Sequence, residues 1–203
     1  MFTQGCNFRC GYCHNPELVI PERFCPSIPE QEVFDFLRSR QQYLQGVVVS
    51  GGEPTIQGGL VAFLDQIKRL GYLIKLDTNG GQPDILRQLV QLKLLNYVAM
   101  DVKAPLDRYE EIINAMIDPR KIEQSIEIII HSGIKHEFRT TVVKSLCSQE
   151  DLYKIRQMIK GSQRYNLQKA RIDENVLDQR LSGQGQYTDE EFKCFKEELE
   201  KCV

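Results

Sequence analysis

The regular alternation of short apolar runs with longer stretches of helical periodicity constrains the fold of this chain most. Five runs are rich in β-forming residues and end in turn residues, namely 45–50, 72–76, 97–102, 137–143 and 165–170. Between them, apolar residues recur at helical spacing over 33–44, 60–67, 85–92, 122–130 and 152–159. Repeated strand–helix units predict an α/β fold whose parallel strands are wound in one hand.

The N-terminal end of the pattern is unusually short. Only five residues precede Cys6, so a strand leading into that region would have almost no length. Counting this strand, we predict a partial (β/α)6 barrel of parallel strands whose first strand is truncated or very short. The 203 residues suit one hydrophobic core, so we expect a single domain over 1–203.

Glycine and acidic residues follow two of the predicted strands. In folds of this kind, ligands bind at the C-terminal ends of the strands. Gly51 and Gly52 end the first long strand and permit a close backbone approach to a ligand. Glu53 could accept hydrogen bonds from an ammonium group, and Asp77 opens the turn after the next strand. The alternative to a ligand site is a glycine turn with a solvated glutamate at 51–53 and an ordinary turn after the next strand.

Charged residues mark the ends of the next two strands. Strand alternation puts Asp101 and Lys103 on one face, where a ligand or a local ion pair would satisfy them. Arg139 lies on the following strand, and its planar guanidinium suits a carboxylate. An arginine that faces solvent on an edge strand is the alternative.

Three of the seven cysteines, Cys6, Cys10 and Cys13, crowd into one short segment. An odd number of cysteines without an export signal argues against a disulfide framework. Thiolates suit iron–sulfur clusters or zinc. Three thiolates could hold three irons of a cubane and leave the fourth iron open. A zinc site with His14 as fourth ligand, or three free cysteines, are the alternatives. The other cysteines, at positions 25, 147, 194 and 202, show no paired spacing, so we expect no second cluster.

The string FTQGCNFRCGYCHNPE at 2–17 closely resembles the glycyl-radical enzyme activating proteins of the radical S-adenosylmethionine superfamily. Within that family it most resembles the activating proteins of anaerobic ribonucleoside-triphosphate reductase. The glycine, acidic and lysine motifs at 50–54, 77–80 and 100–103 follow in the family's order, so the resemblance extends from residue 2 to about residue 168.

This resemblance implies one [4Fe–4S] cluster held by Cys6, Cys10 and Cys13, with S-adenosylmethionine chelating the open iron. Tyr12 would lie beside the adenine, or have only a packing role. Lys103 and Arg139 would reach the methionyl carboxylate. No catalytic residue is expected beyond the cluster and the cofactor. The implied cofactor-binding residues are Tyr12, Gly51, Gly52, Glu53, Asp77, Asp101, Lys103 and Arg139.

The implied reaction is reductive cleavage of S-adenosylmethionine, with the electron coming from a flavodoxin or ferredoxin-type donor. The resulting 5′-deoxyadenosyl radical would remove a hydrogen atom from a glycine of a partner enzyme. Three alternatives stay open. They are a pyruvate formate-lyase-type activating enzyme, a small-molecule enzyme similar to 7-carboxy-7-deazaguanine synthase, and a noncatalytic metal-binding or redox-sensing module.

Charge and hydropathy narrow the classes of partner. The formal net charge is −2 and no long run of one sign occurs, so we expect neither nucleic acid nor an anionic membrane as a partner. No apolar run approaches the roughly 18 residues that span a bilayer. The N-terminus lacks the order of a signal peptide, which predicts a cytoplasmic protein.

Overall fold

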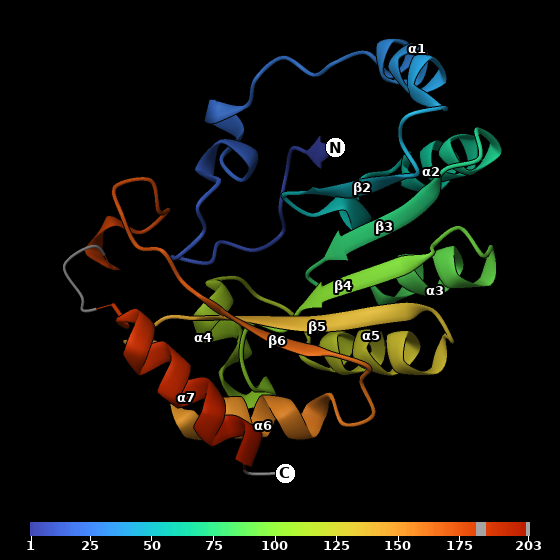
Figure 1. The fold of residues 1–203 in the computed structure, drawn as a ribbon. Helices are drawn as coiled ribbons and strands as arrows, with labels where there is room; N and C mark the ends of the chain where they lie inside the picture. Colours follow the sequence, from blue (N-terminus) through green and yellow to red (C-terminus); the bar gives the residue numbers. More distant parts are fainter. Residues whose placement is uncertain (182–185, 202–203) are drawn as a thin grey trace.

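The computed structural model describes residues 1–181 and 186–201, without the side chains of 198–201 (Figure 1). Its centre is one sheet of six strands in the order β1-β2-β3-β4-β5-β6, in which every neighbouring pair is parallel. The strands are β1 (Phe2–Thr3), β2 (Gly46–Gly51), β3 (Leu73–Thr78), β4 (Tyr97–Asp101), β5 (Lys135–Val142) and β6 (Tyr165–Lys169). The sheet is open, with β1 and β6 at its edges, which confirms the predicted partial barrel.

Helices connect the strands in the predicted places. The α-helices are α1 (Glu30–Arg40), α2 (Leu60–Arg69), α3 (Pro83–Gln91), α4 (Tyr109–Ile113), α5 (Arg120–His131), α6 (Gln149–Met158) and α7 (Asp189–Lys201). Short 3-10 helices are η1 (Pro16–Leu18), η2 (Pro21–Arg23), η3 (Pro54–Ile56), η4 (Leu106–Arg108) and η5 (Gln179–Leu181). The first predicted helix ends before Leu44, because a turn at 41–43 leads into β2. The sequence did not predict α4, whose five residues are too few to show a helical period.

The two faces of the sheet differ sharply in exposure. The side chains that point toward the helices are buried, and Ile74, Leu76 and Phe138 are fully buried. Burying each such side chain contributes about 1.5–3 kcal/mol. On the opposite, concave face, Val48 is 44% exposed and Leu73 is 54% exposed. Parallel sheets are ordinarily covered on both faces, so the exposed part of the inner face along β2 and β3 is the unusual feature of the fold.

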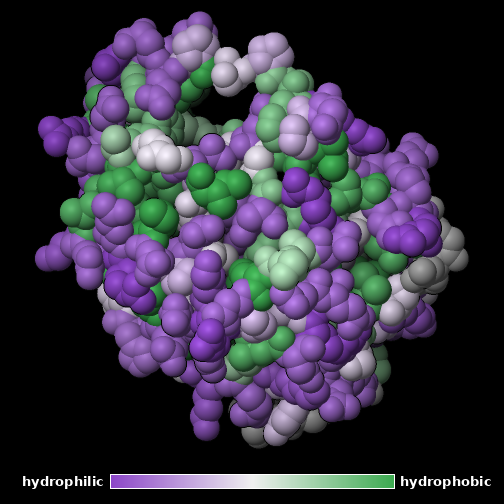
Figure 2. Space-filling model, turned by 180° about the vertical axis from the view of Figure 1, so that it is seen from behind, coloured by the Kyte–Doolittle hydropathy of each residue, from purple (hydrophilic) through white to green (hydrophobic). Residues whose placement is uncertain are grey.

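The helical side of the sheet is largely polar at its surface. Helices α2, α3 and α5 lie along one side of the sheet (Figure 1), and the molecule seen from behind is mainly hydrophilic with scattered hydrophobic residues (Figure 2). Within 1–181 and 186–201, no helix has the length and apolar character needed to cross a bilayer.

The first strand is as short as predicted. Phe2 and Thr3 pair with Ser50 and Gly51 of β2, and the Met1 ammonium donates to the Val48 carbonyl at 2.8 Å. The chain then passes directly into the loop that carries the three cysteines. This pairing brings that loop to the C-terminal end of β2, where the glycine motif begins.

Candidate functional site

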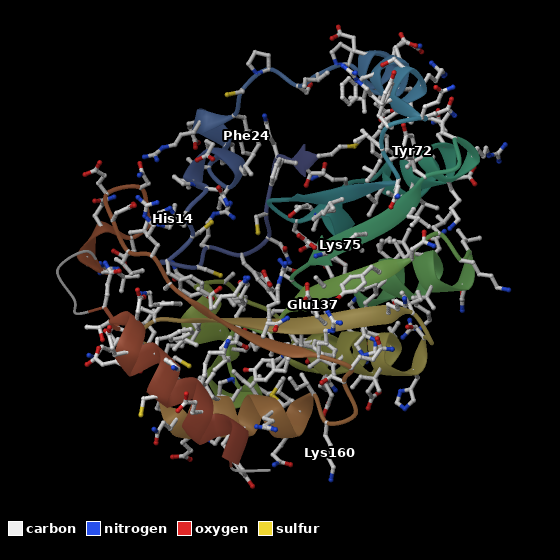
Figure 3. All side chains as sticks on the ribbon, in the orientation of Figure 1. His14, Phe24, Tyr72, Lys75, Glu137 and Lys160 are labelled. Atoms are coloured by element: carbon white, nitrogen blue, oxygen red, sulfur yellow. The ribbon has the colours of Figure 1, made fainter. Side chains whose placement is uncertain are left out.

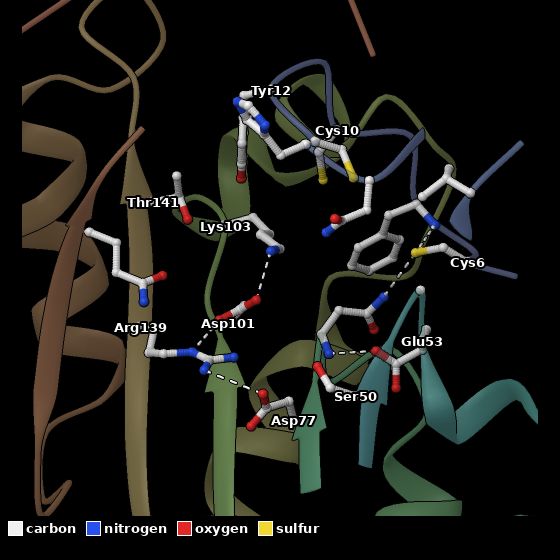
Figure 4. Close-up of a pocket in the computed structure, with 18 of the residues that line it drawn as sticks. Cys6, Cys10, Tyr12, Ser50, Glu53, Asp77, Asp101, Lys103, Arg139 and Thr141 are labelled. Carbon is white, nitrogen blue, oxygen red and sulfur yellow. Dashed lines mark hydrogen bonds and ion pairs between the residues drawn. The ribbon is translucent and has the colours of Figure 1, made fainter. Parts of the chain in front are cut away.

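The C-terminal ends of the strands surround a cavity of about 440 Å³ (Figure 4). The cysteine loop closes one side of it, and β2 to β6 supply the rest of the wall. All the residues predicted from the sequence as metal ligands or cofactor contacts line this cavity, namely Cys6, Cys10, Tyr12, Cys13, Gly51, Gly52, Glu53, Asp77, Asp101, Lys103 and Arg139. The fold therefore brings together motifs that lie up to 133 positions apart in the sequence, from Cys6 to Arg139.

Backbone hydrogen bonds from several elements hold the cysteine loop. The Cys13 amide donates to the Cys10 carbonyl at 2.9 Å, and the Arg9 amide donates to the Ile113 carbonyl at 2.8 Å. The Arg9 guanidinium donates to the Cys6 carbonyl at 2.6 Å. Cys10 is buried, whereas Cys6 and Cys13 are partly exposed. Burial raises the pKa of the Cys10 thiol to about 11, so metal binding there must displace a proton.

A segment after β6 supports the same loop from the other side. The Leu177 amide donates to the Cys13 carbonyl at 3.0 Å, and the Asp178 amide donates to the Gly11 carbonyl at 2.8 Å. A Cβ atom on Gly11 would lie 3.1 Å from the Asp178 Cβ, so the packing favours glycine there. No sequence motif marked residues 177 and 178, because their contribution is made by backbone amides.

His14 makes contacts that count against the zinc alternative. Its Nε2 atom lies 2.6 Å from the Arg171 carbonyl oxygen and 3.6 Å from Asp173 Oδ1. The ring is thus engaged with the segment after β6. In the described part of the chain, no three His, Cys, Asp or Glu side chains converge as ligands of a single metal ion. Thiolates on different irons of a cubane stand further apart than the ligands of one ion, so this spacing remains compatible with a cluster.

The glycine motif packs against the start of the cysteine loop. Gly51 has a φ of +123°, which favours glycine. The Gly52 amide donates to the Thr3 carbonyl at 2.9 Å, and the Glu53 amide donates to the Gly5 carbonyl at 2.8 Å. A Cβ atom on Gly52 would lie 2.1 Å from the Gly5 carbonyl oxygen. The motif thus fixes the position of the cysteine loop relative to β2.

Glu53 is buried and already bonded within the protein. Its Oε1 accepts from the Thr55 amide at 3.0 Å and from the Thr78 hydroxyl at 2.7 Å, and its Oε2 accepts from the Asn79 amide at 2.6 Å. Burial raises the pKa of Glu53, while these hydrogen bonds oppose the rise. The carboxylate therefore ties the ends of β2 and β3 together, a function that the sequence did not predict. The expected contact with an ammonium group would have to share these oxygens.

Alternating charges form a row along the cavity floor. Asp101 accepts from Arg139 Nε at 2.7 Å and from Lys103 Nζ at 3.0 Å, and Arg139 Nη1 lies 3.6 Å from Asp77 (Figure 4). Burial would raise the pKa of Asp101, but the two cations hold it below its usual value. Burial would likewise lower the pKa of Lys103, but Asp101 keeps it well above its usual value. Arg139 is only 16% exposed on an interior strand, so the alternative of a solvent-facing edge residue is wrong.

The row continues down the inner face of the sheet. Lys75 Nζ lies 3.5 Å from Asp77 and 3.3 Å from Glu137, and the Asn166 amide donates to Glu137 at 2.7 Å. Lys75 and Glu137 point toward each other on the open face (Figure 3). Neither residue was identified from the sequence, since single charges on different strands carry no motif.

Two buried oxygens in this region have no hydrogen-bond partner in the described part of the chain. They are the Tyr12 hydroxyl and Asp77 Oδ1, of which the second still lies 3.5 Å from the Lys75 ammonium in an ion pair. Tyr12 is only 7% exposed, so its unpaired hydroxyl is costly unless a ligand satisfies it. Three thiols, a tyrosine hydroxyl without a hydrogen-bond partner and two cations around one cavity fit a cofactor that has both a metal part and a polar organic part.

The remaining cysteines lie away from this cavity. Cys25 and Cys194 are exposed, and Cys147 is partly buried against Asp151 and Arg108. Cys202 lies outside the described residues.

A sequence profile and two known proteins match most of this chain. A sequence profile described as Radical SAM superfamily matches residues 1–152. A protein of Methanocaldococcus jannaschii, whose name assigns it provisionally to the glycyl-radical enzyme activating enzymes, is 34% identical over 176 residues, which cover 83% of this chain and 70% of the relative. The 7-carboxy-7-deazaguanine synthase of Thermococcus kodakarensis is 26% identical over 176 residues, covering 77% of this chain and 68% of that protein.

The fold also has a close structural counterpart. The crystal structure of Streptococcus suis SuiB bound to S-adenosylmethionine superposes with a TM-score of 0.77 at 15% identity, covering 99% of this chain. The chain spans 46% of the length of SuiB. At this identity the likeness shows a shared fold and nothing about the substrate.

Proposed function

Because the chain belongs to the radical S-adenosylmethionine superfamily, we propose that it activates a glycyl-radical enzyme by using a [4Fe–4S] cluster held by Cys6, Cys10 and Cys13. The observation that carries this proposal is the single cavity that joins the three thiols to the charged row of β3, β4 and β5. The homology to a glycyl-radical enzyme activating protein supports the reaction class.

The polar residues of the cavity would bind and orient S-adenosylmethionine. When bound, the cluster and S-adenosylmethionine together supply a one-electron reductive cleavage that yields methionine and a 5′-deoxyadenosyl radical. Lys103 and Arg139 would bind the methionyl carboxylate, and Asp101 would hold both cations in place. The backbone of Gly51 and Gly52 would approach the methionyl amine. The Tyr12 hydroxyl, which has no hydrogen-bond partner among the described residues, would gain one from the bound S-adenosylmethionine.

The open inner face would admit the protein substrate. It is continuous with the cavity through Asp77 and Arg139, and Val48 and Leu73 expose apolar surface along it. A glycine has no side chain, so an extended segment of the partner could bring its Cα hydrogen close to the cofactor. The cavity would also exclude water from the reacting atoms.

The partner is proposed to be anaerobic ribonucleoside-triphosphate reductase, on the basis of the cysteine-loop string at 2–17. A pyruvate formate-lyase-type partner is the nearest alternative. The electron donor would be a cytoplasmic flavodoxin or ferredoxin. The similarity to 7-carboxy-7-deazaguanine synthase favours one further candidate, a small-molecule enzyme of the same superfamily.

Two experiments test these proposals in sequence. The protein is loaded anaerobically with iron and sulfide, reduced, and assayed for 5′-deoxyadenosine, with Cys10→Ala as the test and the exposed Cys25→Ala as the matched control. We expect product from the control alone, and product from Cys10→Ala would refute the cluster assignment.

The wild type is then mixed with each candidate reductase or lyase. A glycyl-radical doublet in electron paramagnetic resonance identifies the partner, whereas turnover of 7-deazaguanine precursors without a doublet would support the small-molecule enzyme.

A further inference from the structure

Asn79, in the turn after β3, directs its side-chain amide at one of the three cysteine sulfurs. We propose that Asn79 sets the reduction potential of the cluster through an N–H···S hydrogen bond to Cys6. This proposal rests on the proposed cluster assignment and adds to it a positioning residue that acts through a ligand. Asn79 Nδ2 lies 3.9 Å from Cys6 Sγ and also donates to Asn7 Oδ1 at 2.9 Å.

The orientation of this amide follows from its neighbours. Asn79 Oδ1 accepts from the Gly81 backbone amide at 2.9 Å. That N–H can only donate, so the carboxamide oxygen must face Gly81 and the NH2 group must face Cys6 and Asn7. Asn79 is 6% exposed, and a Cβ atom on Gly81 would lie 2.7 Å from Asn7 Nδ2. The amide is thus held in a close-packed site.

The backbone around Asn79 is fixed as firmly as its side chain. The Asn79 amide donates to Glu53 Oε2 at 2.6 Å, which links it to the glycine motif. On the other side of the turn, the Ser125 hydroxyl of α5 donates to the Gly80 carbonyl at 2.7 Å. These bonds therefore hold the Asn79 side-chain amide close to the Cys6 sulfur.

A donor at this sulfur has a definite electrostatic effect. The Phe8 backbone amide also reaches Cys6 Sγ, at 3.4 Å, so this one sulfur has two N–H donors. Hydrogen bonds to cluster sulfurs stabilise the more negative, reduced state and so raise the reduction potential. A radical S-adenosylmethionine enzyme requires a cluster that a biological donor can reduce, and Asn79 would make that reduction easier.

The test is a redox titration of the loaded protein, followed by the electron paramagnetic resonance signal of the reduced cluster. We expect Asn79→Ala to lower the equilibrium constant for one-electron reduction by about three- to tenfold, which corresponds to about 28–59 mV at 59 mV per tenfold change. Ser125→Ala is the matched control, because it removes one hydrogen bond to the same turn while the bonds of Asn79 to Glu53, Gly81 and Asn7 remain. It should keep the wild-type potential.

The outcomes separate this inference from the proposed function. If the wild type takes up no cluster, both are overturned. If Asn79→Ala and wild type bind four irons each and titrate at the same potential, or if Ser125→Ala shifts equally, only the role of Asn79 is overturned. Should Asn79→Ala fail to fold, wild type labelled with 15N-asparagine provides the readout. A 15N coupling to the reduced cluster in electron–nuclear double resonance supports the hydrogen bond, and its absence contradicts it.

Discussion

Replacing Lys103 by methionine should weaken the binding of S-adenosylmethionine by about tenfold. Methionine keeps much of the aliphatic length of lysine and removes the ammonium group, which lines the cavity 3.0 Å from Asp101 Oδ2. Asp101 stays paired with Arg139 Nε at 2.7 Å, so the variant does not leave a buried carboxylate alone. The change therefore removes one cation from the ligand site while the fold keeps its main ion pair.

The expected magnitude follows from the geometry of the two cations. A hydrogen bond to a charged group contributes about 1.5–3 kcal/mol, and each 1.4 kcal/mol is about tenfold in affinity. Lys103 is 14% exposed, so solvent screens its charge only in part. Arg139 remains to bind the same carboxylate, which places the loss near the lower end of the range.

Equilibrium dialysis of the cluster-loaded protein measures this effect. S-adenosylhomocysteine, which has the carboxylate, should lose affinity in Lys103→Met, whereas 5′-methylthioadenosine, which lacks it, should bind as to wild type. Lys75→Met is the matched control, since Lys75 lies on the same inner face outside the cavity lining. Equal affinities of wild type and Lys103→Met for S-adenosylhomocysteine, within twofold, would refute the role given to Lys103.

Three other changes test separate parts of the molecule. Leu73→Glu, on the open inner face, should lower the yield of partner glycyl radical more than tenfold while 5′-deoxyadenosine formation continues; equal loss of both would contradict separate sites for cofactor and partner. Gly52→Ala should impair iron uptake, because its Cβ would lie 2.1 Å from the Gly5 carbonyl oxygen, whereas Gly58→Ala, with open space around it, should not. Burial would raise the pKa of Asp151, but hydrogen bonds from the start of α6 and an arginine hold it below its usual value. Asp151→Asn should therefore cost about 1–3 kcal/mol of unfolding free energy at pH 7. In urea titrations that cost should shrink as the pH falls below about 4, because the stability from a depressed carboxyl pKa is complete above the unfolded value and is lost as the pH falls through the folded one; a cost independent of pH would contradict this.

Much of the fold could be predicted because its signals are local. Each strand from β2 to β6 is a short apolar run that ends in a turn, and each long helix has an apolar face, so both appear in a sequence window. The short first strand followed from the few residues before Cys6. The helix α4 could not be found in this way, because five residues show no period and its place depends on the burial of Tyr109, Ile112 and Ile113.

Sequence motifs identified part of the candidate site. Residues whose role depends on a tertiary contact could not be identified from the sequence. The cysteines and the glycine motif carry recognisable spacing, and strand alternation placed Asp101 beside Lys103. Glu53 links the ends of β2 and β3 through hydrogen bonds from threonines of two different segments. The support of the cysteine loop by residues 177 and 178 uses only backbone amides. Such contacts leave no pattern in the sequence.

Mössbauer spectroscopy of protein loaded with 57Fe tests the central assignment most directly. Three thiolates from Cys6, Cys10 and Cys13 should give a [4Fe–4S] cluster with one iron unlike the other three. Adding S-adenosylmethionine should change the parameters of that iron alone. A spectrum that does not respond to S-adenosylmethionine, or a protein that binds a single zinc ion in place of iron, would contradict the account.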